Sequence, residues 1–86
     1  MMRRRRLLRQ LSHGRLGNFR FTEMTDLVEG FGFQLARVTG SHHIFTHPAI
    51  RELVNIQQVR GEAKPYQVRQ FLRLVERYDL HLEDNE

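Results

Sequence analysis

Apolar residues recur three or four positions apart after residue 20, which is the spacing of one face of a helix. They are Phe21, Met24, Leu27, Val28 and Phe31. The spacing predicts a helix over residues 22–30. We expect Thr22 to be its N-cap, because a threonine hydroxyl can accept a hydrogen bond from the unpaired amides of a first turn. Gly30 and Gly32 are expected to end the helix.

Between residues 33 and 59 the pattern changes to an alternation with a period of two, which is typical of strands. The predicted strands are residues 33–39, 42–47 and 53–57, and the last can extend to Val59. Gly40 and Ser41 form a tight turn between the first two strands. Pro48 ends the second strand because it cannot donate to a ladder, and residues 49–52 are expected to form a longer turn.

A final helix is predicted over residues 65–78, after a loop over residues 61–64. Pro65 suits its first position, where a missing N–H costs nothing. Its apolar stripe consists of Val68, Phe71, Leu72, Leu74, Val75 and Tyr78. The element order is therefore α-β-β-β-α, an α+β fold. Two helices cover one face of a three-stranded antiparallel sheet and leave the other face open for binding.

Charge divides the chain into two parts. Residues 1–20 contain seven arginines and no acidic residue, whereas residues 21–86 contain seven basic and ten acidic residues, for a net charge of +4 overall. We expect a basic, mobile or peripheral arm over residues 1–20 and a single domain over residues 21–86 that ends in an acidic tail. Such an arm attracts nucleic acid, acidic proteins or anionic lipid, unless it is simply a solvated surface.

The chain length and composition exclude several classes of protein. Eighty-six residues suit one small domain. The absence of cysteine excludes disulfides, thiolate metal sites and cysteine nucleophiles. No apolar run approaches the roughly 18 residues of a membrane-spanning helix, and the N-terminus lacks the apolar stretch of a signal peptide. We therefore expect a soluble, cytoplasmic protein without a membrane partner.

The segment from Gly40 to His47 holds three histidines. On a strand, His42 and His43 point to opposite faces, while His43 and His47 share a face about 13 Å apart, too far for one metal ion. We expect neither a metal nor another cofactor. An imidazole can act as a general acid or base near neutral pH, and the turn before it lets backbone amides approach a phosphate. The alternative is an ordinary polar residue at the start of a strand.

A second candidate site begins at Lys64, at the N-terminal end of the predicted final helix. Helix N-termini bind anions. Arg69 follows one turn later, on a different face from Phe71 and Leu72. These two cations could hold a phosphate chain, and the alternative is an ordinary loop followed by a solvated arginine.

These motifs and their order resemble the HicA toxin family over about residues 21–80. Gly40-Ser41-His42 corresponds to the Gly-Ser-His element of the family, whose histidine is catalytic, and the segment from Lys64 to Arg69 corresponds to its Lys-Pro-Gly-Thr-Leu-Arg helix start. The chain departs from the family at residues 55–58, where Asn-Ile-Gln-Gln replaces a common proline–histidine segment. The arginine-rich arm and the acidic tail are additional.

The resemblance implies a fold like that of double-stranded-RNA-binding domains. It also implies a metal-independent mRNA interferase, the toxin of a type II toxin–antitoxin pair, whose HicB-type antitoxin covers the histidine surface. Two other functions are considered. One is a non-catalytic RNA-binding module with the same fold, and the other is a small protein whose basic arm docks on an acidic partner.

The resemblance also implies roles for individual residues. His42 is expected to be the general acid or base, and His43 is the alternative because the doublet can be aligned either way. The residues expected to contact RNA are Gly40, Ser41, Arg37, Lys64 and Arg69, of which the last three hold phosphates.

Overall fold

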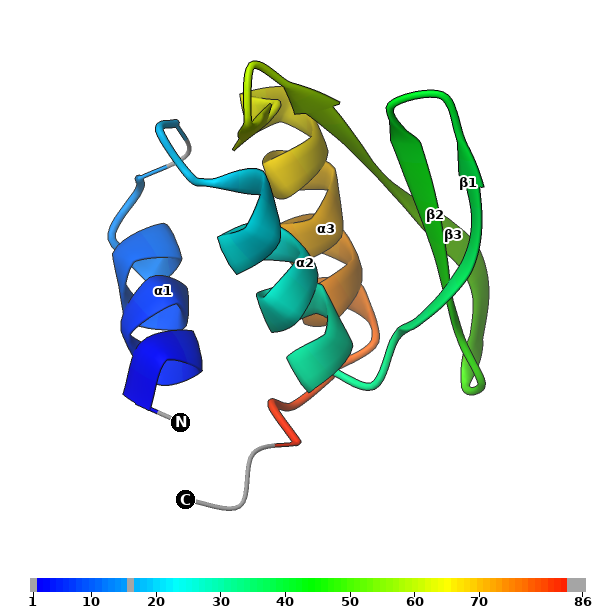
Figure 1. The fold of residues 1–86 in the computed structure, drawn as a ribbon. Coiled ribbons are helices and arrows are strands. Elements are labelled where there is room, and N and C mark those ends of the chain that lie inside the picture. The colour runs from blue at the N-terminus through cyan, green and yellow to red at the C-terminus, as the bar shows by residue number, and fades with distance from the viewer. Residues whose placement is uncertain (1, 16, 84–86) are drawn as a thin grey trace.

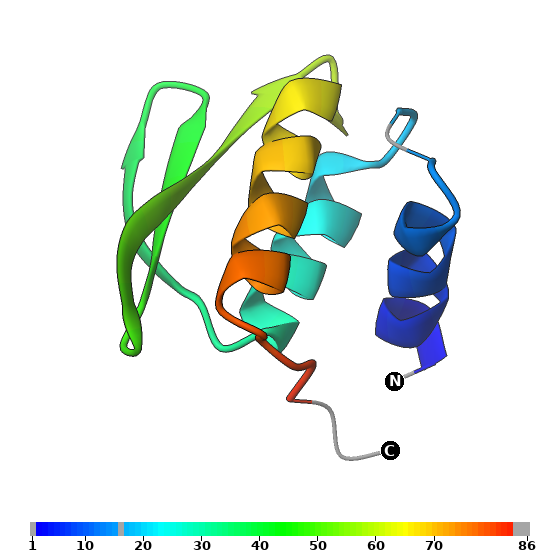
Figure 2. The ribbon, with the colours of Figure 1, turned by 180° about the vertical axis from the view of Figure 1, so that it is seen from behind.

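The protein is built in three layers, as the computed structural model of residues 2–15 and 17–83 shows (Figure 1). The elements are α1 (Met2–Ser12), α2 (Phe21–Gly30), β1 (Gln34–Thr39), β2 (His42–His47), β3 (Ile50–Val59), β4 (Glu62–Ala63) and α3 (Pro65–Arg77). The strands form one antiparallel sheet in the order β1-β2-β3-β4. Helices α2 and α3 cover one face of it, and α1 lies beyond them, on the side away from the sheet (Figure 2).

Helix α2 begins at Phe21, one residue before its predicted start. The expectation that Thr22 is the N-cap is wrong, because the cap is Arg20. The side chain of Phe21 is buried in the core, so the helix starts there. The carboxylate of Glu23 then accepts a hydrogen bond of 3.1 Å from the Arg20 N–H. A glutamate at this position commonly bonds back to the N–H of the N-cap residue, as in one half of a capping box.

The sheet follows the predicted strands, with two corrections. The turn expected at residues 49–52 is wrong, because β3 already begins at Ile50 and only Pro48 and Ala49 connect it to β2. The loop expected at residues 61–64 contains the short strand β4, so the sheet has four strands rather than three. The α+β class and the helix–sheet–helix layout are confirmed.

The additional strand results from a two-residue hairpin. Arg60 and Gly61 both have positive φ angles, 53° and 80°. Two consecutive residues of this kind produce the turn whose twist matches that of a β-hairpin. Glu62 is therefore placed opposite Val59, and β4 forms the edge strand next to β3.

The hydrophobic core lies between the sheet and the helices and extends to α1. It includes Phe19, Met24, Leu27, Val28, Phe31, Phe45, Ile56, Val68 and Phe71. Leu7 and Leu11 of α1 are each 3% exposed and belong to the same core. Arg4 forms a bidentate hydrogen-bonded ion pair with Asp26 of α2, at 2.9 and 3.0 Å. The expected arm thus contains a helix that packs against α2.

The chain turns sharply after α2 at Gly32, where φ is 95°. A Cβ atom at this position would lie 2.6 Å from Oε2 of Glu83 and 2.9 Å from Nε2 of His47. The Glu83 N–H donates a hydrogen bond of 2.6 Å to the Gly30 carbonyl. The C-terminal segment therefore returns to the end of α2, whereas the end of the expected acidic tail, residues 84–86, lies outside the described residues. Over the described ranges, none of the helices combines the length and the apolarity needed to cross a bilayer.

Candidate functional site

His42 begins β2 on the face of the sheet that the helices leave open. Side chains alternate along a strand, and Phe45 points into the core with 1% exposure. His43 therefore shares the core face, and His42 lies on the opposite face with Ile44. The ring of His42 is half-buried, so solvent can still reach it.

A hydrogen bond to β3 orients the His42 ring. Its Nδ1 lies 3.2 Å from Oδ1 of Asn55, which is opposite Ile44 in the neighbouring strand. An amide oxygen only accepts, so in the neutral ring the proton lies on Nδ1 and the lone pair on Nε2. The arrangement suits a general base, because one ring nitrogen is held and the other is ready to accept a proton.

The turn before His42 is tied to the same strand. The Ser41 hydroxyl oxygen accepts a hydrogen bond of 3.2 Å from Nε2 of Gln57, and the Ser41 carbonyl accepts one of 3.0 Å from the Gln58 N–H. Gly40 has a φ of 59°, a conformation that glycine adopts without strain. Gly40 and Ser41 are exposed. They hold the start of β2 in place and keep its backbone accessible.

A buried amide joins this part of the sheet to α3. Gln67 is 2% exposed, and its Oε1 accepts a hydrogen bond of 2.6 Å from the Gln57 N–H. Gln57 is opposite His42 in the sheet register. This hydrogen bond therefore links the first turn of α3 to Gln57, the residue of β3 that is opposite His42.

The sequence predictions of the site omitted Asn55, Gln57 and Gln67. The alternation of β3 could have indicated the first two, because both are at positions whose side chains point to the open face.

The other two histidines of the segment have different surroundings. The ring of His43 packs edge-on against Phe21 with centroids 4.5 Å apart, and its buried Nδ1 has no hydrogen-bond partner among the described residues. In His47, Nδ1 accepts from the Ala49 N–H at 3.0 Å, so Nε2 carries the proton and donates to the Phe31 carbonyl at 3.1 Å. Both nitrogens of His47 are occupied in holding the chain. Among the described residues, no group of three or more potential ligands is placed to bind a metal ion.

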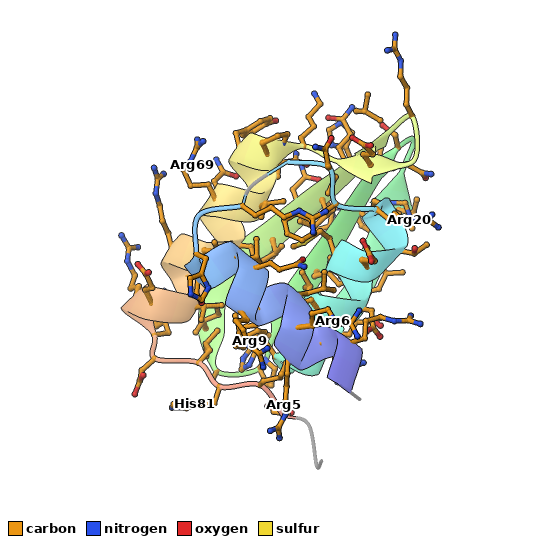
Figure 3. The ribbon with its side chains drawn as sticks, turned by 90° about the vertical axis from the view of Figure 1, so that its left-hand side faces the viewer. Arg5, Arg6, Arg9, Arg20, Arg69 and His81 are labelled. Carbon is orange, nitrogen blue, oxygen red and sulfur yellow. The ribbon has the colours of Figure 1, made fainter. Side chains whose placement is uncertain are left out.

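The structure separates the three cations that were predicted to hold phosphates. Arg37 is exposed and lies opposite Ile44, so it shares the open face with His42 as a diagonal neighbour. Lys64 is the N-cap of α3, beside a hollow of about 430 Å³, and its Nζ lies 5.8 Å from the centre of the Tyr66 ring. Arg69 is exposed on α3, on the helical side of the molecule (Figure 3). Arg37 is thus brought to His42, whereas Arg69 is not.

The fold and the site can now be compared with known proteins. Residues 21–76 match the family model described as the HicA toxin of bacterial toxin–antitoxin systems. The chain belongs to the HicA toxin family. The matched segment extends from the first residue of α2 almost to the end of α3, so it contains the whole sheet and His42 and leaves out α1. Comparison with curated proteins and with solved structures found no match.

Membership in the HicA family makes this protein a toxin of a bacterial toxin–antitoxin system. Such a toxin has an antitoxin as its partner. The family model spans the sheet and the two helices that cover it, so these elements make up the HicA part of the chain. Helix α1 is an addition that packs on this part.

Proposed function

We propose that this HicA toxin is an endoribonuclease that cleaves mRNA in the cytoplasm without a metal ion, with His42 as its general acid and base. One observation carries the proposal: Asn55 holds Nδ1 of His42 and leaves Nε2 on the open face of the sheet. A half-buried imidazole with one nitrogen fixed and one free is prepared to move a proton near neutral pH.

The proposed reaction needs only this base and positive charge. Nε2 of His42 takes the proton of a ribose 2′-hydroxyl, whose oxygen attacks the adjacent phosphorus. A bond forms between the 2′-oxygen and phosphorus, the bond to the 5′-oxygen breaks, and the proton passes from His42 to that leaving oxygen. Arg37, on the same face, stabilises the charge on the phosphoryl oxygens.

The remaining predicted contacts serve binding in this proposal. Gly40 and Ser41 let the backbone at the start of β2 approach the RNA. Lys64 offers a cation at the first turn of α3, where the helix dipole also favours a phosphate, and Arg69 contributes charge further along the helix. In this proposal the sheet around His42 and helix α3 share the RNA contacts.

The antitoxin is proposed to be of the HicB type and to cover the sheet around His42. Two apolar side chains of β3 support a protein partner there, because they alternate with the core positions and share the open face with Asn55 and Gln57. Leu53 and Val59 are 54% and 39% exposed. Apolar side chains that remain exposed on a sheet are typical of a surface that a protein partner buries.

The test is digestion of a defined RNA by the purified toxin in excess chelator, with the variants His42→Ala and His43→Leu. We expect the wild type to cleave, His42→Ala to lose at least about 100-fold in rate, and His43→Leu to keep its rate. Leucine is the matched control because it replaces a ring that packs in the core.

Two results would contradict this function. One is loss of cleavage on chelation, and the other is full activity of His42→Ala. If the RNA is bound but its length stays unchanged over hours, the protein is a binding module instead.

A further inference from the structure

Helix α1 presents arginines on the side of the molecule that is opposite the sheet. Arg3, Arg6 and Arg9 are exposed and follow one another at a spacing of three residues, so they are neighbours along one stripe of the helix. Leu7 and Leu11 of the same helix are buried in the core. Figure 3 looks onto this side, with Arg6 and Arg9 on α1 and Arg69 on α3.

Helix α3 extends this charge. Arg69 and Arg73 are exposed and four residues apart, about 6 Å along the helix axis. Arg73 also lines a hollow of about 570 Å³ along α3, together with Glu76 and Arg77. We call the five arginines the helical basic surface: Arg3, Arg6, Arg9, Arg69 and Arg73. Within residues 2–15 and 17–83, none of these five forms an ion pair.

The helix that carries these arginines is held in place on the fold. Leu7 and Leu11 are buried, and Arg4 is joined to Asp26 by two hydrogen bonds. A partner therefore does not have to order a flexible arm before the charges can act together. This preorganisation lowers the entropic cost of binding.

The chemistry of the surface favours RNA over a membrane. A helix that lies in a bilayer needs an exposed apolar face, but the leucines of α1 at positions 7 and 11 are used in the core. The guanidinium group has a planar fork of donors that matches a phosphate, and it stays charged at every physiological pH. The open sheet face, by contrast, presents only Arg37 and Arg51 as exposed cations among its described residues.

We infer that the helical basic surface binds the phosphate backbone of RNA as a second contact, separate from the sheet face that carries His42. The inference rests on the proposed function for its choice of RNA. Because α1 lies outside the matched residues 21–76, it adds an RNA contact that the family part of the chain does not contain.

The experiment measures binding of a labelled single-stranded RNA of about 20 nucleotides by fluorescence anisotropy between 50 and 200 mM salt. All proteins carry His42→Ala, so that the RNA stays whole. The test variant is Arg3→Gln/Arg6→Gln/Arg9→Gln, and the matched control replaces the same three arginines by lysine.

We expect the glutamine variant to bind about tenfold more weakly or worse. The slope of log K against log salt should be smaller in magnitude by about 2, because each lost contact to a phosphate of a single strand reduces the slope by roughly 0.7.

Lysine keeps the charge but not the fork of donors, so the lysine variant should retain the slope and most of the affinity. A second variant, Arg73→Gln, removes charge from α3 without touching α1, and it should also weaken binding. Thermal melting of each variant checks that it is folded.

Unchanged RNA affinity and slope in the glutamine variant overturn the inference. So does a glutamine variant that keeps its RNA affinity and loses affinity for the antitoxin, because the surface then serves an acidic protein. Cleavage does not enter this measurement, and the nuclease activity can fail or stand independently of it.

Discussion

The two adjacent histidines of β2 differ in what their neighbours allow them to do. Asn55 holds one nitrogen of His42 on the open face, whereas His43 packs against Phe21 on the core face. The alternation along a strand was enough to predict that the two rings point in opposite directions. It did not tell which ring faces solvent, because that depends on which side of the sheet the helices cover.

The Asn55→Asp substitution tests how His42 is held. A carboxylate beside the ring favours the charged imidazolium, which cannot accept a proton. We therefore expect the acidic limb of the pH–rate profile to move to higher pH by about one unit, while the rate at alkaline pH stays near that of the wild type. Asn55→Leu, which offers no acceptor, should lower kcat over the whole pH range with little change in KM. An unshifted profile in Asn55→Asp would show that Asn55 does not position His42.

The Asn55 contact could not be predicted from the sequence. It depends on the register between β2 and β3, which places Asn55 opposite Ile44 and within reach of the ring at position 42. The register follows in turn from the two-residue connection at Pro48 and Ala49, which had been predicted to be longer. Gln67 was assigned to a helix correctly, but its hydrogen bond to the strand is a tertiary contact.

Among the helices, α1 has the least expected placement. The sequence, with its seven arginines in residues 1–20, suggested a mobile or peripheral arm. Burial of Leu7 and Leu11 and the ion pair of Arg4 with Asp26 account for the packing that is observed. The strands were more predictable, since β2 has its predicted limits and β1 differs by one residue. The hairpin that adds β4 uses Arg60-Gly61, a pair that does not stand out as a turn signal.

The attachment of α1 depends on pH through Asp26. The hydrogen bond from Arg4 lowers the pKa of the Asp26 carboxyl below its ordinary value of 3.8. A group whose pKa is lowered by folding stabilises the native state above its unfolded pKa, and this contribution is lost as the pH falls through the folded pKa. At pH 7 we expect Asp26→Asn to lower the melting temperature by about 2–4 °C, because a pair exposed to this extent contributes about 0.5 kcal/mol.

The difference in melting temperature between Asp26→Asn and the wild type should shrink as the pH falls below about 4, because the wild-type carboxyl then loses its charge by protonation. Thermal melts at pH 7, 5 and 3 measure it. A difference in melting temperature that stays constant from pH 7 to pH 3 would show that the ion pair does not stabilise the fold.

Over the entire protein, two different surfaces lie on opposite sides. The sheet side has His42 and exposed apolar residues, and the helical side has the arginines of α1 and α3. The excess of charge in residues 1–20 was visible in the sequence. Its position was not, because only the packing of α1 on α2 places this charge away from the sheet. The proposed antitoxin site and the inferred RNA contact therefore do not overlap.

Leu53 tests the proposed antitoxin surface. It lies on the open face of β3 and is 54% exposed, so an aspartate there should leave the fold intact. We expect Leu53→Asp to weaken binding of the antitoxin at least about tenfold, because a charge would be desolvated in an apolar contact. Isothermal titration calorimetry measures the affinity, and Val38→Asp is the control, because Val38 is equally exposed but lies opposite His43 on the other face of the sheet. Equal affinities of wild type and Leu53→Asp would place the antitoxin elsewhere.

The turn at Gly32 has a consequence for how this chain can evolve. Its left-handed conformation disfavours every other residue, and a side chain there would collide with the carboxylate of Glu83 and with the ring of His47. That ring cannot move aside, because both of its nitrogens are bonded to the backbone. Position 32 is therefore constrained twice, by its backbone conformation and by the ring at position 47, although neither residue has a part in the proposed chemistry.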